Sequence, residues 1–278
     1  MVKRDIFKRF MVMETSVLFT SAARATVLTL CWLLALEVAG QPGKGQLISH
    51  GAVIRGDTAK RQLALVFTGH QFAEGGSAIL KALEEEQVKA SFFFTGDFYR
   101  RIAFRPLIED IKRRGHYLGA HSDKHLLYCD WEQRDRLLVS KQEFAEDLKN
   151  NYREMAKFGI GKEDARCYLP PYEWYNDSIS KWTAEMGLQL VNFTPGTRSN
   201  ADYTSPEMEN YVSSEAILRS IMDQETSKGL SGFILLMHIG VSPKRTDKFY
   251  DKLPILISTL RQRGYHLVTV DELLCLQH

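Results

Sequence analysis

Short apolar runs and longer segments with helical spacing alternate along most of this chain. The run from Leu63 to Phe67 (LALVF) is typical of a strand covered on both faces. Helical spacing follows it at Ile79, Leu80 and Leu83. Repetition of this pattern predicts seven strands, at 63–67, 90–94, 117–120, 166–169, 189–193, 233–237 and 266–269. The intervening segments predict helices, the longest within 132–158 and others near 177–186, 213–224 and 248–263.

Strands that alternate with helices of this length imply parallel pairing and an α/β fold. Seven such units favour an incomplete barrel over an open dinucleotide-binding sheet. No GxGxxG follows the first strand, which also disfavours nucleotide binding. The sequence therefore predicts one barrel-like domain over residues 63–278.

The N-terminal segment has a different character. Basic residues precede a charge-free apolar run from Ala25 to Leu36, and small residues follow up to Gly40. This order is typical of a secretory signal peptide. We predict a cleaved signal over 1–40, an N-terminal extension over 41–62, and an exported protein (periplasmic, cell-surface or secreted). The alternative is an uncleaved membrane anchor, but the run is shorter than the roughly 20 residues of a spanning helix, so we expect no stable span after cleavage.

Charge and cysteine content narrow the function classes. The chain has 36 basic and 34 acidic residues among 278. Because phosphate binding needs a clustered basic face, this balance argues against a nucleic-acid partner. Cys129 and Cys167 could form one disulfide in an oxidising compartment, but their spacing does not decide it. The sequence leaves the oligomeric state open.

Histidines gather at the predicted strand exits. His70 follows the first strand, His121 and His125 the third, and His238 the sixth. In a parallel barrel the loops at these ends build the active site. A lone histidine there is more often structural, but four at one end indicate a site. If residues after the third strand turn helical, the spacing of His121 and His125 puts both rings on one face, where they could hold a divalent ion.

The segment GAHSDKH (Gly119 to His125) resembles the H-[ST]-x-x-H motif of the polysaccharide deacetylases, the NodB-homology domain of carbohydrate esterase family 4. Other family motifs have counterparts in the same order. These are LALVFTGH (63–70), VKASFFFTG (88–96), YLPPYEWYN (168–176) and SGFILLMH (231–238). The resemblance implies a distorted (β/α)7 barrel of the NodB type.

The resemblance also implies a metal-dependent hydrolase that removes acetyl groups from an oligo- or polysaccharide, as a de-N-acetylase or an O-acetyl esterase. By family analogy, His121 and His125 hold the ion, and His70 is a candidate third ligand. The backbone N–H of Tyr172 would stabilise the oxyanion, and His238 would protonate the leaving group. Imidazole ligands favour zinc.

Departures from the family pattern keep other functions open. Thr68 and Gly69 stand where the family has two aspartates, the base and a metal ligand, and Leu169 replaces the arginine that orients the base. Glu173, at a family glycine, is a candidate replacement base, and Asp123 is another. The alternatives are a catalytically silent protein that binds glycans and a metal hydrolase for another amide or ester.

Further features of the sequence are weaker indications of function. Residues 192–203 have no clear match to the family's fourth motif, which contains a tryptophan. Four aromatic residues, Trp131, Tyr172, Trp174 and Tyr175, could form a platform for sugar rings, although core packing is the more common role of any one of them. The basic residues Lys244, Arg245 and Lys248 indicate a solvated loop.

Overall fold

A computed structural model describes residues 45–276 of the chain. The predicted signal peptide (1–40) lies outside the described residues. Among residues 45–276, none of the helices combines the length and the apolar character that crossing a membrane requires.

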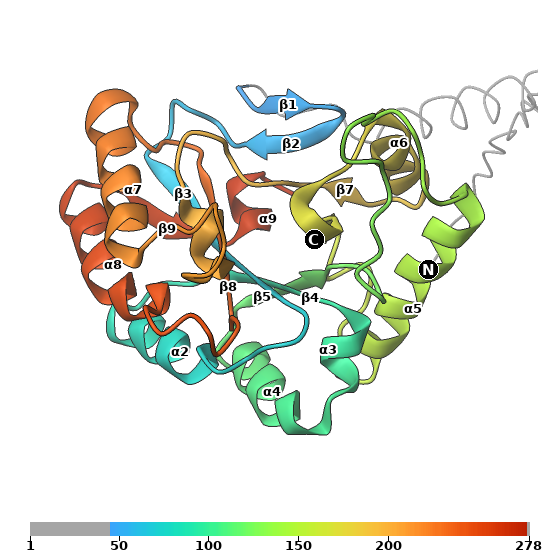
Figure 1. Cartoon of the computed structure of the whole chain (residues 1–278), viewed down its shortest axis with the longest axis horizontal. Helices are drawn as coiled ribbons and strands as arrows, with labels where there is room; N and C mark the ends of the chain where they lie inside the picture. The colour runs from blue at the N-terminus through green and yellow to red at the C-terminus, as the bar shows by residue number, and fades with distance from the viewer. Residues whose placement is uncertain (1–44, 277–278) are drawn as a thin grey trace, which may run out of the picture. The chain divides into compact units, whose positions relative to one another are not determined.

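A curled parallel sheet forms the centre of the fold (Figure 1). Its strands are β3 (Gln62–Gly69), β4 (Ser91–Phe94), β5 (Tyr117–Ala120), β6 (Cys167–Tyr168), β7 (Gln189–Leu190), β8 (Ile234–His238) and β9 (His266–Val268). They lie in the order β7-β6-β5-β4-β3-β8, and β9 pairs with the start of β3. All seven predicted strands and their parallel pairing are confirmed, and the result is a barrel of the predicted (β/α)7 type.

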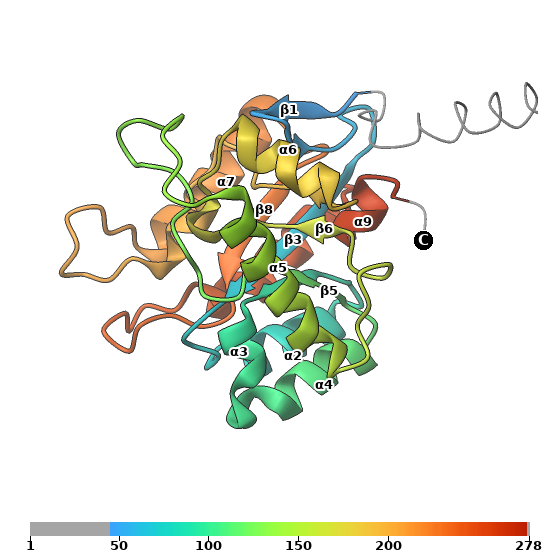
Figure 2. The ribbon, with the colours of Figure 1, turned by 90° about the vertical axis from the view of Figure 1, so that its right-hand side faces the viewer.

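Helices cover the outside of this sheet (Figures 1 and 2). They are α2 (Gly76–Glu85), α3 (Gly96–Arg100), α4 (Arg105–Arg113), α5 (Lys141–Ala156), α6 (Asp177–Glu185), α7 (Ser214–Lys228), α8 (Leu253–Gln262) and α9 (Val270–Leu273). Short 3-10 turns are η1 (Ile102–Phe104), η2 (Pro171–Glu173), η3 (Ser199–Tyr203) and η4 (Phe249–Lys252). The helix predicted within 132–158 occupies only the later part of that range, because Ser140 and Glu143 form a capping box that starts α5 at Lys141.

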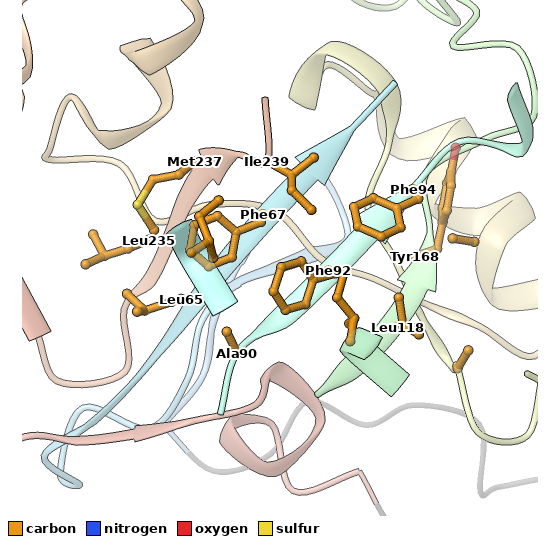
Figure 3. Packing of buried hydrophobic residues seen from close by; sticks show 14 of the residues in the cluster. Leu65, Phe67, Ala90, Phe92, Phe94, Leu118, Tyr168, Leu235, Met237 and Ile239 are labelled. Carbon is orange, nitrogen blue, oxygen red and sulfur yellow. The ribbon is translucent and has the colours of Figure 1, made fainter. Parts of the chain in front are cut away.

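Alternate strand residues pack into two apolar layers. Leu65, Phe67, Phe92 and Phe94 lie side by side on the helix-covered face (Figure 3). The rings of Phe67 and Phe92 stack with centroids 5.2 Å apart. Neighbouring residues such as Val66 belong to the second layer, on the other face of the sheet. Because burial of one such side chain contributes about 1.5–3 kcal/mol, the two layers fix the strands and so the positions of the loops that follow them.

Residues before β3 form a hairpin of β1 (Leu47–Ser49) and β2 (Ala52–Arg55). Val53 is buried, and its carbonyl accepts a hydrogen bond of 3.0 Å from the N–H of Asn192. The described part of the predicted N-terminal extension therefore packs on the barrel edge beside β7.

The disulfide considered between Cys129 and Cys167 is not formed. Both thiols are free and buried. Burial raises the pKa of Cys129 to about 11, so it stays a protonated thiol near neutral pH.

Candidate active site

The six site residues predicted from the sequence line one pocket of about 790 Å³ at the carboxyl ends of the strands. They are His70, His121, His125, Tyr172, Glu173 and His238. They follow β3, β5 and β6 or, in the case of His238, end β8, and the carboxyl ends of these strands meet at the same edge of the sheet. This is where a parallel barrel collects functional side chains.

The three histidines on one wall contact one another through a turn. Ser122 and His125 have positive φ angles, 73° and 56°, so residues 121–125 are not helical and the expected helical pairing is wrong. The turn nevertheless brings the ring centroid of His125 to 5.1 Å from that of His121 and to 4.8 Å from that of His70.

These imidazoles are held in the neutral form. Burial lowers the pKa of His121 to about 3 and that of His125 to about 2, and it also lowers the pKa of His70. The Nδ1 of His121 lies 2.8 Å from the carbonyl oxygen of Leu169. Because a carbonyl only accepts, Nδ1 carries the proton and Nε2 keeps a free lone pair, as a metal ligand needs.

The predicted set of three zinc ligands is not assembled as a metal site in this structure. Within residues 45–276, no group of three or more His, Cys, Asp or Glu side chains has a metal-binding arrangement. The Nδ1 of His70 is instead 3.1 Å from the hydroxyl of Thr95, and its ring stacks on His125 at an interplanar angle of 13°. His70 therefore lies beside His125 without sharing a metal-binding arrangement with His121 and His125 in this structure.

Thr68 and Gly69 stand at the two positions where the resemblance expects carboxylates, and Gly69 has no space for a side chain. A Cβ atom at Gly69 would lie 2.8 Å from Phe94 Cδ1 and 2.9 Å from Ile239 Cγ2, closer than real Cβ contacts. The hydroxyl of Thr68 is buried and has no hydrogen-bond partner in the described structure. Leu169 is fully buried in the apolar layer where the family has an arginine.

His238 is held by a carboxylate that the sequence analysis missed. The Nδ1 of His238 lies 2.6 Å from Asp202 Oδ1, and its backbone N–H donates to Oδ2 at 2.9 Å. Burial alone would lower the pKa of His238, but Asp202 and Glu173 outweigh it and raise that pKa. Asp202 lies in η3, within the segment that had no clear family match. The only signal in the sequence was an acidic residue in SNADY, with nothing to connect it to His238.

Glu173 occupies a strained turn at the pocket. Tyr172 and Glu173 have φ angles of 59° and 53°, in the left-handed region that costs a non-glycine residue about 1–3 kcal/mol. Asn192 holds the turn by donating from Nδ2 to the carbonyl of Glu173 at 2.8 Å. Burial raises the pKa of Glu173 to about 7. A half-buried acid with a raised pKa in a cleft is a candidate for a functional group.

Asp123, the other candidate base, forms its contacts away from the pocket. Asp123 is buried, and its Oδ1 accepts a hydrogen bond of 2.8 Å from Arg100 Nη1. Asp123 does not line the pocket. Its carboxylate therefore anchors α3 to the turn at 121–125.

Arg245, expected on a solvated loop, is fully buried. Its guanidinium donates to the carbonyls of Thr204 and Asp247 at 2.6 Å and of Val212 at 3.0 Å. It thereby joins the loop after η3 to the loop after β8. Since Asp202 and His238 precede these two loops, Arg245 supports the wall on which they meet.

Two of the four aromatic residues considered as a sugar platform reach the pocket. Trp131 is 54% exposed and Tyr172 44% exposed, and their ring centroids lie 5.5 Å apart. Trp174 packs behind Trp131 and beneath the guanidinium of Arg134. Tyr175 is buried and belongs to the core.

Comparison with known proteins agrees with this fold. The family model "Polysaccharide deacetylase" matches residues 55–191. A peptidoglycan-N-acetylglucosamine deacetylase from Bacillus cereus is 24% identical over 200 residues, which cover 72% of this chain and 82% of that protein. Among solved structures, the Bc1960 peptidoglycan N-acetylglucosamine deacetylase superposes with a TM-score of 0.65 at 21% identity, covering 81% of this chain and 92% of the other. A carbohydrate esterase family 4 pseudoenzyme from Bacillus anthracis superposes with a TM-score of 0.63 at 20% identity, covering 82% and 70%.

Residues 55–191 of the chain therefore belong to a polysaccharide deacetylase domain. Polysaccharide deacetylases are a class of hydrolases that act on carbon–nitrogen bonds other than peptide bonds.

Proposed function

We propose that this protein hydrolyses acetyl groups on a carbohydrate, with Glu173 as general base and His238 as general acid. The observation that carries the proposal is the placement of two titratable groups on one pocket. Glu173 has a pKa raised to about 7, and His238 is paired with Asp202 at 2.6 Å. Two such groups with different protonation states near neutral pH are what acid–base hydrolysis requires.

In the proposed reaction, ionised Glu173 accepts a proton from a water molecule, and the resulting hydroxide attacks the acetyl carbonyl carbon. The backbone N–H of Tyr172 stabilises the oxyanion of the tetrahedral intermediate. Protonated His238 then gives its proton to the leaving nitrogen or oxygen as the bond to the acetyl carbon breaks. The products are acetate and the free amine or hydroxyl of the sugar.

The pocket surface supports a carbohydrate substrate. Eleven large apolar side chains are exposed in the described structure, and five of them line this one pocket: Phe72, Trp131, Tyr172, Tyr203 and Met208. A concentration of exposed aromatic surface in a cleft usually marks a binding site. Sugar rings have apolar faces that match such surfaces and polar edges that suit the histidines between them.

Zinc dependence and export are further parts of the proposal. His121 and His125 would hold the ion, with His70 as the predicted third ligand. Bound zinc would lower the pKa of a coordinated water. The export proposal has its own measurement, since the mature N-terminus of the secreted protein should begin near Gln41. Recovery of an intact N-terminus in the membrane fraction would favour the anchor instead.

A catalytically silent glycan-binding protein is the second candidate. The closed position at Gly69 and the unpaired hydroxyl of Thr68 favour it, because neither family carboxylate has been retained. Acetate release separates the two functions. Wild type should release acetate from N- or O-acetylated oligosaccharides, and His238→Ala should slow this by roughly 10²–10⁴-fold at unchanged folding. Glycan binding without any acetate release would establish the silent protein.

A further inference from the structure

The turn over residues 121–125, which carries the histidine pair, is held between two helices. These are α3 and α5, which contact each other and lie side by side (Figures 1 and 2). The N–H groups of Gly96 and Asp97, at the start of α3, donate to the carbonyls of Ser122 and Asp123 at 3.0 and 3.1 Å. A Cβ atom at Gly96 would collide with Oδ1 of Asp123, so the approach of α3 requires a glycine there.

Helix α5 accepts the N–H groups of the same turn. The buried carboxylate of Asp147 accepts the N–H of Asp123 with Oδ2 at 3.1 Å and the N–H of Lys124 with Oδ1 at 3.0 Å. Asn151, also buried, accepts the N–H of His121 with Oδ1 at 2.9 Å. Because residues four apart in a helix share a face, α5 presents both acceptors to the turn.

The two acceptors on α5 are themselves fixed by further hydrogen bonds. The hydroxyl of Tyr128 donates to Asp147 Oδ2 at 2.8 Å. Asn151 Nδ2 donates to the carbonyl of Phe94 at 3.2 Å, and this carbonyl also accepts a longer bond of 3.3 Å from the N–H of His121. A buried network whose members are all paired is rigid. The turn is therefore tied to α5 and to the end of β4 together.

We propose that Asp147 and Asn151 are positioning residues for His121 and His125. Neither lines the pocket, and each acts through the backbone of the turn. Ser122 and His125 have left-handed backbone angles that L residues rarely adopt, so the turn needs such external acceptors to persist. They set the ring centroids of the histidine pair 5.1 Å apart at the pocket. The proposal deepens the function proposed above and rests on it, because the geometry of the pair matters to the reaction only if the pair serves it.

The test is Asp147→Asn in the full chain. An amide has the size of a carboxylate but one acceptor oxygen, and its NH₂ group would face one of the N–H groups of Asp123 and Lys124. The matched control is Glu146→Gln, which makes the same change of charge at an exposed residue of α5.

NMR of the histidine rings measures the geometry of the pair without any need for activity. Wild type and Glu146→Gln should show nuclear Overhauser contacts between the ring protons of His121 and His125, and Asp147→Asn should lose them. Acetate release by Asp147→Asn should have a kcat lower by roughly 10–100-fold at an almost unchanged KM, because the substituted residue does not contact substrate.

Two further variants distinguish positioning from a merely structural role. Tyr128→Phe removes a partner of Asp147 but leaves the turn both of its acceptors on α5. It should lower the free energy of unfolding while the ring contacts and kcat stay as in wild type. If Asp147→Asn does not fold, Asn151→Ala tests the same point by removing the side-chain acceptor of His121.

The outcomes separate the positioning role from the catalytic function. Unchanged ring contacts in both Asp147→Asn and Asn151→Ala, or equal losses of these contacts in Tyr128→Phe and Asp147→Asn, would overturn the positioning role even if acetate is released. Loss of the ring contacts in Asp147→Asn alone, in a protein whose wild type releases no acetate, would support positioning and refute the deacetylase function.

Discussion

His238 and the carboxylate of Asp202 make a two-point contact. Asp202 accepts from the backbone N–H of His238 with one oxygen and lies 2.6 Å from its Nδ1 with the other. This fixes both the ring orientation and the position of the proton, so that Nε2 is the atom free to exchange a proton with a ligand. The pair is the best-defined acid–base element of the site.

Replacement of Asp202 by Asn should lower the pKa of His238, because the neighbouring carboxylate is what raises it against burial. A general acid works only while protonated, so the alkaline limb of the pH–rate profile should move to lower pH. NMR titration of the His238 ring would report the pKa without any need for activity. An unchanged pKa in Asp202→Asn would contradict this assignment.

Glu173→Gln should abolish the acidic limb of the pH–rate profile, which we expect near pH 7 because a base must be ionised. The same substitution should make the protein more stable at high pH. The pKa of Glu173 is raised in the folded state, so its ionisation costs stability as pH rises from its ordinary value of 4.5 through about 7. Thermal unfolding at pH 5 and pH 8 measures this, and a stability gain confined to pH 5 would have the wrong sign.

Metal content provides an independent test of the proposed metal site at His70, His121 and His125. If zinc binds there, purified protein should hold about one ion per chain, and His121→Ala with His125→Ala should remove it. Elemental analysis of both proteins is the measurement, and His266→Ala, at an exposed residue that begins β9, is a matched control. Identical metal content in wild type and the double variant would exclude this site.

Arg245→Lys should destabilise the protein by about 3 kcal/mol or more, because a buried cation would lose most of its partners. Lys244→Ala is the natural control. Its partner Glu207 forms an exposed ion pair, which is worth at most about 1 kcal/mol. Denaturant unfolding measures the loss of stability in both variants. Similar losses of stability would mean that Arg245 does not support the pocket wall on which Asp202 and His238 meet.

Substitutions at the adjacent residues Thr68 and Gly69, at the end of β3, should affect the free energy of unfolding differently. Gly69→Ala should cost about 1–3 kcal/mol, since its new methyl group meets Phe94 and Ile239. Thr68→Val should be neutral or stabilising, because it removes a buried hydroxyl that has no partner. Chemical denaturation distinguishes them, and a large loss in Thr68→Val would show that the hydroxyl is satisfied in solution.

Much of the fold and part of the site follow from local sequence patterns. Apolar runs such as 63–67 mark buried strands, and parallel strands bring their carboxyl ends together, so His70, His121, His125 and His238 could be placed on one pocket from spacing alone. The irregular segment before α5 was not predictable at this level, because loops lack a periodic pattern.

Tertiary structure alone decided which groups meet. Asp202 lies 36 residues before His238, and no local pattern links them. Arg245 lies in a basic segment that predicts a solvated loop, yet it is buried and donates to the carbonyls of Thr204 and Val212 in a distant segment. Likewise, the sequence determined that Gly69 replaces a carboxylate, but only packing showed that Phe94 and Ile239 fill the space. The physical reason is that periodicity reports what each segment buries, whereas charge pairing and steric fit depend on residues distant in the chain.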